Sequence, residues 1–139
     1  VSKIKNIDYD FYGYKNKEPI WGNKFYVSLI NSKMGLNLSR GKPTKYYSSN
    51  RIASLMGNGL LTFIDKKTQI DDFFSKNELI FYENLNDLAD KIKFYKKNDK
   101  LRQKISARGR KKYFALFNEI KTCKNIINIC TENKNSFFQ

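Results

Sequence analysis

The stretch MGLNLSRGKPTKYYSSNRIASLMGNGLLTFID, residues 34–65, contains the pattern that decides the fold of this chain. Apolar residues alternate with small or polar ones over 34–39, which is typical of a strand. A polar loop over 40–49 follows, and then a short capped helix that extends to Met56. The run over 60–64 is continuously apolar, as in a strand covered on both faces. A strand, a helix and a strand in this order predict part of a parallel sheet.

Both flanks of this stretch extend the same pattern. Upstream, the alternation over 7–11 predicts a strand that ends at Gly13, and the apolar spacing over 19–32 predicts an amphipathic helix. Downstream, the sequence predicts a helical turn over 70–74, a strand over 79–82, helices from about 84, 99 and 118, and a frayed tail over 132–139. We therefore expect an α/β fold: a Rossmann-like parallel sheet flanked by helices, with a helical C-terminal tail.

The length and the first residue indicate how the chain is organised. We expect residues 1–139 to form a single domain, since this is the usual size of one. Four predicted strands resemble the later part of a doubly wound domain, which has five or six. The chain starts at Val1 without an initiator Met, so we expect a C-terminal fragment of a longer protein.

The loop after the second predicted strand is the strongest candidate for a binding site. In open α/β sheets, ligands bind beyond the carboxyl ends of the strands. This loop, 40–49, is rich in cations, hydroxyls and tyrosines and leads into a helix N-terminus, which attracts phosphate. Arg51 is unfavourable in the first turn of a helix unless an anion binds there, and Arg40 begins the same loop. The alternative is that these residues are only surface charges and a helix cap.

Several classes of protein are excluded by what the sequence lacks. There is no His, so no Ser–His or Cys–His nucleophile can form. No G-x-G-x-x-G or P-loop motif is present, so dinucleotide oxidoreductases and P-loop enzymes are not expected. Asp71 and Asp72 are adjacent and should point in different directions. We expect no metal site and no cofactor.

The two cysteines predict a helix face rather than a bridge. Cys123 and Cys130 are seven residues apart, which on a helix separates them by roughly 10 Å along one face. That separation is too long for a disulfide. We expect both to be small buried residues in a reduced, cytoplasmic protein.

The net charge of +14 has two explanations. It fits a polyanionic partner, either nucleic acid or an anionic membrane, and it also fits the codon usage of an AT-rich genome. Cations are dense over 91–112, but the aromatic residues among them have a spacing that suits burial. A basic nucleic-acid-binding domain is therefore the alternative function. A peripheral membrane contact would use Lys96, Lys97, Lys111 and Lys112.

Residues 34–65 resemble the donor-binding region of group 1-like glycosyltransferases of the GT-B fold. The nearest resemblance is to the C-terminal domain of the branch that includes the spore-maturation CgeB-like proteins. The shared frame is a strand of the type Gly-Leu-Asn-Leu, a variable loop, and a short helix with Arg51 in its first turn and a turn that ends at Gly59. The stretch FYENLNDLADKIKFYKKNDKLRQKISARGRKKYFALFN, residues 81–118, continues it, and the resemblance covers about 7–131.

The resemblance implies a transferase that uses a nucleotide-sugar donor, for example in polysaccharide biosynthesis. The implied donor-binding residues are Arg40, Lys45, Tyr47, Ser48, Ser49, Asn50, Arg51 and Ser54. Independently of the resemblance, the place of Gly13 after the first predicted strand makes it a possible second donor loop. Ser54 stands where the family has a Glu that contacts the donor ribose. Such enzymes need no metal, because cations and a helix N-terminus stabilise the leaving diphosphate. The acceptor site is expected in a missing N-terminal domain, so the fragment alone should be inactive.

Overall fold

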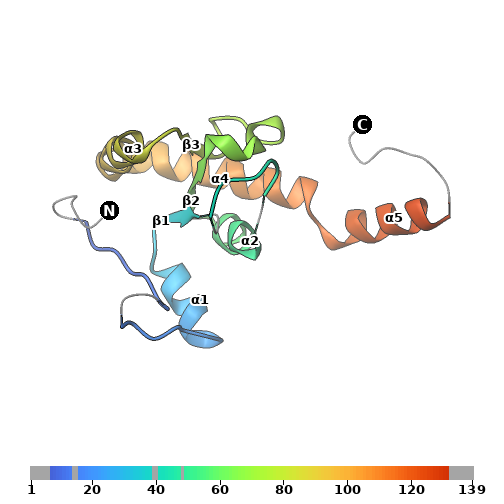
Figure 1. The fold of residues 1–139 in the computed structure, drawn as a ribbon, viewed down its shortest axis with the longest axis horizontal. Helices are drawn as coiled ribbons and strands as arrows, with labels where there is room; N and C mark the ends of the chain where they lie inside the picture. The colour runs from blue at the N-terminus through green and yellow to red at the C-terminus, as the bar shows by residue number, and fades with distance from the viewer. Residues whose placement is uncertain (1–6, 14–15, 39–40, 48, 132–139) are drawn as a thin grey trace.

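The computed structural model describes residues 7–13, 16–38, 41–47 and 49–131. At its centre is a parallel sheet with the strand order β1-β2-β3 (Figure 1). The strands are β1 (Met34–Asn37), β2 (Leu61–Asp65) and β3 (Ile80–Tyr82). Phe63 in the central strand lies opposite Leu36 of β1 and Ile80 of β3. The predicted α/β fold, with an open parallel sheet, flanking helices and helices at the C-terminal end, is confirmed.

Helices surround the sheet and then extend beyond it. They are α1 (Asn23–Ile30), α2 (Asn50–Gly57), α3 (Leu85–Lys97), α4 (Asp99–Leu116) and α5 (Glu119–Cys130), with 3-10 turns η1 (Lys66–Thr68) and η2 (Ile70–Asp72). Helix α2 connects β1 to β2, as the apolar pattern of 34–65 predicts. The turns η1 and η2 connect β2 to β3, and the three longest helices follow the last strand.

The side chains of β2 alternate between two hydrophobic cores. Leu61 and Phe63 join a cluster that includes Ile92 of α3 and Ile105 of α4. Ile64 joins a second cluster with α2 and with the segment between β2 and β3. Residues 61–64 are all buried, which explains why this strand is a continuous apolar run.

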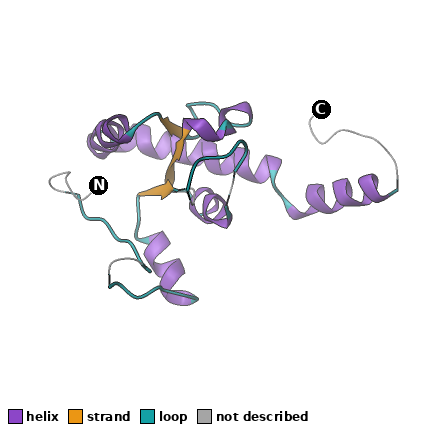
Figure 2. Cartoon of the chain, viewed as in Figure 1, coloured by secondary structure: helices purple, strands orange, loops and turns teal. Residues whose placement is uncertain are grey.

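Helix α4 runs behind the strands in the view of Figure 2, and its contacts lie near the end of the sheet at which the strands begin. Arg102 Nη1 donates a hydrogen bond to the carbonyl of Lys33, just before β1, at 3.2 Å. Gly109 packs so closely that a Cβ there would lie 2.2 Å from the carbonyl oxygen of Glu78, just before β3. Arg110 Nε donates to the carbonyl of Gly57, at the end of α2, at 2.9 Å. Three residues of α4 therefore fasten the amino end of the sheet.

The prediction of a strand over 7–11 is wrong. These residues belong to no strand of the described sheet. Ile7 packs against the core that contains Phe63, while Tyr9 and Phe11 are exposed and stack on each other with ring centroids 5.4 Å apart. The alternating pattern therefore reflects contact between neighbouring aromatic side chains and not a strand ladder.

The helix predicted over 19–32 is shorter than expected and begins at Asn23. Gly22 precedes it with φ 56° and ψ −132°, a conformation that residues with a Cβ rarely adopt. Trp21 lies before this break and its side chain is 78% exposed, so it is not part of the buried face. Leu29 is the buried residue of this helix.

Helix α5 has no buried residue, and the prediction that Cys123 and Cys130 are buried is wrong. The helix extends away from the sheet and the other helices (Figure 1), and its apolar residues Ile120, Ile126, Ile127 and Ile129 are exposed among the described residues. The predicted tail over 132–139 lies outside the described residues. None of the described helices is long and apolar enough to cross a membrane.

Candidate functional site

The strands end where the predicted binding loop and the start of α2 come together. Because the sheet is parallel, Asn37, Asp65 and Tyr82 end their strands on the same side. We call this side the carboxyl edge; it also includes Leu38, the loop residues 41–47 and the first turn of α2. It lies opposite the end that α4 fastens.

Ser49 joins the first turn of α2 to the end of β1. Its backbone is extended, with φ −93° and ψ 163°, as is usual for the residue that caps a helix. Its Oγ accepts a hydrogen bond from the N–H of Arg51 at 3.3 Å and donates one to Oδ1 of Asn37 at 3.1 Å. The helix start is thereby fixed against the carboxyl edge.

The guanidinium of Arg51 lies beside the same helix start. Its Nη1 donates a hydrogen bond to the carbonyl oxygen of Leu38 at 2.5 Å. The first turn of α2 contains no acidic residue, so neither the helix dipole nor this guanidinium is neutralised within that turn. The combination is suited to an anionic ligand.

Tyr46 fixes the binding loop to the segment after β2, and sequence reasoning did not select it. Its φ of 58° is uncommon for a residue with a side chain and persists only where contacts hold it. Its N–H donates to the carbonyl of Thr68 at 2.7 Å, and its hydroxyl donates to Asp72 Oδ2 at 2.6 Å. Its ring meets Phe73 edge-on, with centroids 5.1 Å apart. The only sequence signal is its place between the candidates Lys45 and Tyr47.

Other predicted site residues lie along the same loop and helix. The Lys45 ammonium lies 4.7 Å from the centre of the Tyr46 ring. Tyr47 is half-buried in a turn in which its N–H donates to Thr44. Asn50 begins α2, and its carbonyl accepts a hydrogen bond from the Ser54 hydroxyl at 3.1 Å. Arg40 and Ser48 lie outside the described residues.

Gly13 does not follow a strand, so the predicted position of a donor loop at a strand end is not observed there, and a role of Gly13 in donor binding stays a prediction. Its φ is 72°, and its N–H donates to the carbonyl of Lys17 at 3.0 Å. This turn belongs to the segment before α1 and not to the carboxyl edge.

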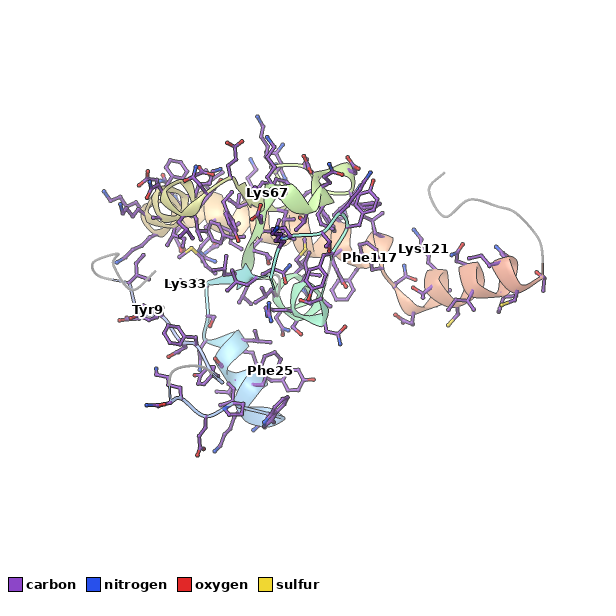
Figure 3. The ribbon with its side chains drawn as sticks, in the orientation of Figure 1. Tyr9, Phe25, Lys33, Lys67, Phe117 and Lys121 are labelled. Carbon is purple, nitrogen blue, oxygen red and sulfur yellow. The ribbon has the colours of Figure 1, made fainter. Side chains whose placement is uncertain are left out.

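The ends of β2 and β3 are also linked by polar groups. Asp65 caps η1 by accepting a hydrogen bond from the N–H of Lys67 at 2.9 Å (Lys67 is labelled in Figure 3). Lys66 pairs with Glu83 at 3.2 Å across the two strand ends. Burial raises the pKa of Tyr82, and the carboxylate of Asp65 raises this pKa further. The phenol of Tyr82 is therefore neutral at physiological pH.

Several cations of the basic run 91–112 have structural partners. Arg102 is only 8% exposed and forms an ion pair with Asp99 at 2.9 Å in addition to its bond with β1. Lys91 donates to the carbonyl of Phe81 at 2.7 Å and pairs with Asp87 at 2.8 Å. These cations stabilise the fold, which accounts for part of the charge run without a nucleic-acid partner.

The spacing of the aromatic residues in this basic run predicted that they are buried, and this prediction is wrong for two of them. Tyr95 and Tyr113 are half-buried, but Phe94 is 50% and Phe114 49% exposed.

Two cavities lie away from the carboxyl edge. One, of about 340 Å³, is lined by residues of the N-terminal segment and α1, including Asp10 and Asn23. The other, of about 380 Å³, lies between the end of α2 and α4 and includes Asn58 and Arg110. Neither includes a predicted donor-binding residue. Within the described part of the chain, no three His, Cys, Asp or Glu side chains gather to hold a metal ion.

The chain was compared with known proteins. It matches the sequence model of a family described as glycosyl transferase-like over residues 2–127. No curated protein and no solved structure matches the chain significantly. The family match covers the strand-loop-helix frame of 34–65, helices α3 and α4, and α5 up to residue 127. The chain therefore belongs to the glycosyl transferase-like family.

Proposed function

We propose that the chain binds the nucleotide diphosphate of a sugar donor at the carboxyl edge, as the donor-binding half of a GT-B glycosyltransferase of the CgeB-like branch. The observation that carries this proposal is the start of α2: Ser49 caps it, no acidic residue neutralises it, and the Arg51 guanidinium is held beside it. Family membership supports glycosyl transfer as the general reaction.

The proposed chemistry is electrostatic. In sugar transfer, the bond from the anomeric carbon to the diphosphate breaks and a bond to the acceptor oxygen forms, while the acceptor proton passes to a base. Negative charge grows on the departing diphosphate, and unpaired N–H groups at the helix start together with Arg51 would stabilise it. Lys45, Tyr47 and Asn50, with Arg40 and Ser48, belong to the same proposed site. We place the acceptor site and the base in a separate N-terminal domain.

Ser54 stands where the resembling family has a Glu that contacts the donor ribose, so this position has no carboxylate. Its hydroxyl donates back to the carbonyl of Asn50 within α2, so it is already engaged by the helix. We propose that the ribose of the donor receives no carboxylate contact from this position.

A thermal-shift panel tests the proposal. It would compare UDP, GDP, ADP and CMP, with pyrophosphate and a short DNA duplex as controls, at low and moderate salt. A specific ligand at about 100 times its dissociation constant should add about 2.7 kcal/mol, which raises the melting temperature by roughly 5–10 °C. The proposal fails if no nucleoside diphosphate shifts the transition, or if only DNA does and salt removes the shift.

A matched pair of arginine variants locates the site. Arg51→Ala should weaken the binding of the nucleoside diphosphate by about 1.5 kcal/mol or more, because a hydrogen bond to a charged group is lost. Arg108→Ala makes the same change on the exposed surface of α4 and should leave the affinity unchanged. Equal affinities in the two variants would reject Arg51 as a donor-binding residue.

We also propose that contact with anionic lipid, where it occurs, uses cations remote from the donor site. The residues are Lys96, Lys97, Lys111 and Lys112, on α3 and α4. Helix α4 fastens the amino end of the sheet, so these cations and the carboxyl edge should act independently. Sedimentation with phosphatidylserine vesicles, with and without the tightest nucleotide, would reveal any competition between the two.

A further inference from the structure

Asn37 has a buried hydrogen-bond donor without a partner. It is the last residue of β1, and its side chain is 1% exposed. Its Oδ1 accepts the hydrogen bond from Ser49, whereas its Nδ2 has no partner. Among the side chains of the described residues, this is the single buried nitrogen or oxygen atom in that condition. Buried polar groups are nearly always paired, so the exception calls for a physical reason.

The surroundings of Asn37 supply that reason. Its amide contacts the cap of α2, so the unpaired N–H lies next to a helix start whose own N–H groups also lack partners within the helix. Arg51, fixed to the carbonyl of Leu38 directly after Asn37, adds further donors. Several donors meet here, and the first turn of α2 offers no acidic acceptor. A ligand that presents several oxygen acceptors would satisfy all of them.

We propose that Asn37 is a ligand-binding residue whose Nδ2 donates a hydrogen bond to a diphosphate oxygen of the donor. This inference rests on the proposed function and adds to it a residue that lies within a strand and outside the predicted loop. In the absence of ligand, the unpaired N–H is unfavourable for folding, which is common where a binding site is preformed.

Two substitutions separate this role from a purely structural one. Asn37→Asp keeps the oxygen that accepts from Ser49 but replaces the N–H donor with an acceptor. Asn37→Leu has a similar size and adds no charge, but removes both the acceptor and the unpaired donor. Asn125→Asp makes the same chemical change as the first variant on α5, far from the sheet (Figure 1).

Titration calorimetry would measure binding of UDP, GDP, ADP and pyrophosphate to all four proteins. For the nucleoside diphosphate that the wild type binds most tightly, both Asn37 variants should bind about tenfold more weakly or worse, and Asn125→Asp should bind normally. Without ligand, Asn37→Leu should melt close to the wild-type temperature, because removal of the unpaired donor offsets the loss of the hydrogen bond from Ser49. A lower melting temperature with unchanged affinity would overturn the inference and assign Asn37 a structural role.

Nuclear magnetic resonance gives a readout in the wild type that does not depend on the affinities of the variants, and one folded Asn37 variant is enough for the assignment. The side-chain amide signals of Asn37 can be assigned because they are missing from the spectrum of either variant. In the wild type, one of these proton signals should move downfield when the nucleotide binds, and an unmoved pair would overturn the inference. If the wild type binds no nucleoside diphosphate at all, the proposed function fails as well; if it binds and only the Asn37 tests fail, the proposed function stands.

Discussion

Gly109→Ala tests how α4 fastens the amino end of the sheet. Gly109 is buried in α4, and a Cβ at this position would lie 2.2 Å from the carbonyl oxygen of Glu78 and 3.2 Å from Cε of Met56. Ordinary van der Waals contact begins at 3.4 Å, so α4 must move away from the Glu78 carbonyl by more than 1 Å. The carbonyl belongs to the backbone just before β3 and cannot rotate aside as a flexible side chain would.

The expected loss of stability is the difference between two opposing effects. Alanine is favoured over glycine inside a helix by about 1 kcal/mol. Forcing a methyl group into a packed contact costs about 1–3 kcal/mol, and the rigid carbonyl here favours the upper end of that range. We expect Gly109→Ala to lower the free energy of unfolding by about 2 kcal/mol, which corresponds to a drop of about 4–8 °C in melting temperature.

Urea unfolding followed by circular dichroism would measure this loss, and Gly57→Ala provides the control. A Cβ at Gly57, the last residue of α2, would meet only Cζ of Phe114 at 3.8 Å, an ordinary contact. Gly57→Ala should therefore leave stability unchanged or raise it by up to about 1 kcal/mol. Nucleotide affinity should remain normal in both folded variants. If Gly109→Ala is as stable as Gly57→Ala, the close contact between α4 and the Glu78 carbonyl is refuted.

Two further predictions concern the carboxyl edge and α3. Tyr46→Phe removes the hydrogen bond to Asp72, so it should cost about 1 kcal/mol and speed amide hydrogen exchange over 41–47; unchanged exchange would show that this bond does not hold the loop. The pKa of Asp87 is lowered by hydrogen bonds from Lys91 and from the N–H of Glu83. A lowered folded-state pKa contributes stability above about pH 4 that is lost as pH falls through it. Asp87→Asn should therefore cost less than about 1 kcal/mol at pH 7, since this pair is partly exposed, and the difference from wild type in urea unfolding should shrink steadily as the pH falls below about 4. A difference that does not change between pH 7 and the acid end of the titration would contradict this origin of the pKa shift.

Local pattern predicted the parts of the fold that lie between residues 34 and 116. In this region the apolar runs coincide with burial on the sheet, and Ser49, Asn84 and Asn118 cap their helices with side-chain oxygens. The start of the candidate site was predictable for the same reason, because a capped helix after a strand is a local feature. The contacts of Arg102 and Arg110 with distant carbonyls were not, since the sequence showed these arginines only as part of a basic run and contains no signal for a backbone partner far along the chain.

The wrong predictions share a cause: a residue pattern typical of a strand or of a buried helix face can occur where no other element pairs with it or covers it. Ile7, Tyr9 and Phe11 alternate like a strand, but two of them stack on each other. Cys123 and Cys130 share a helix face that meets nothing else in the described structure. Periodicity identifies a face, whereas burial also requires a surface that covers it. Tyr46 and Asn37 escaped notice because their importance depends on contacts with the ends of other strands and turns.

Close packing and unpaired hydrogen-bond donors lie at opposite ends of one sheet, and the proposed function places binding at the end with the unpaired donors. At the amino end, Arg102, Gly109 and Arg110 of α4 satisfy or closely approach backbone carbonyls. At the carboxyl edge, donors accumulate instead: the Asn37 N–H has no partner, and the first turn of α2 contains no carboxylate. An arrangement that leaves donors unpaired at one end lowers stability, and the close packing at the other end offsets it. Substitutions at α4 should therefore change the free energy of unfolding more than affinity, while substitutions around Ser49 should do the reverse, because each end makes contacts that the other does not share.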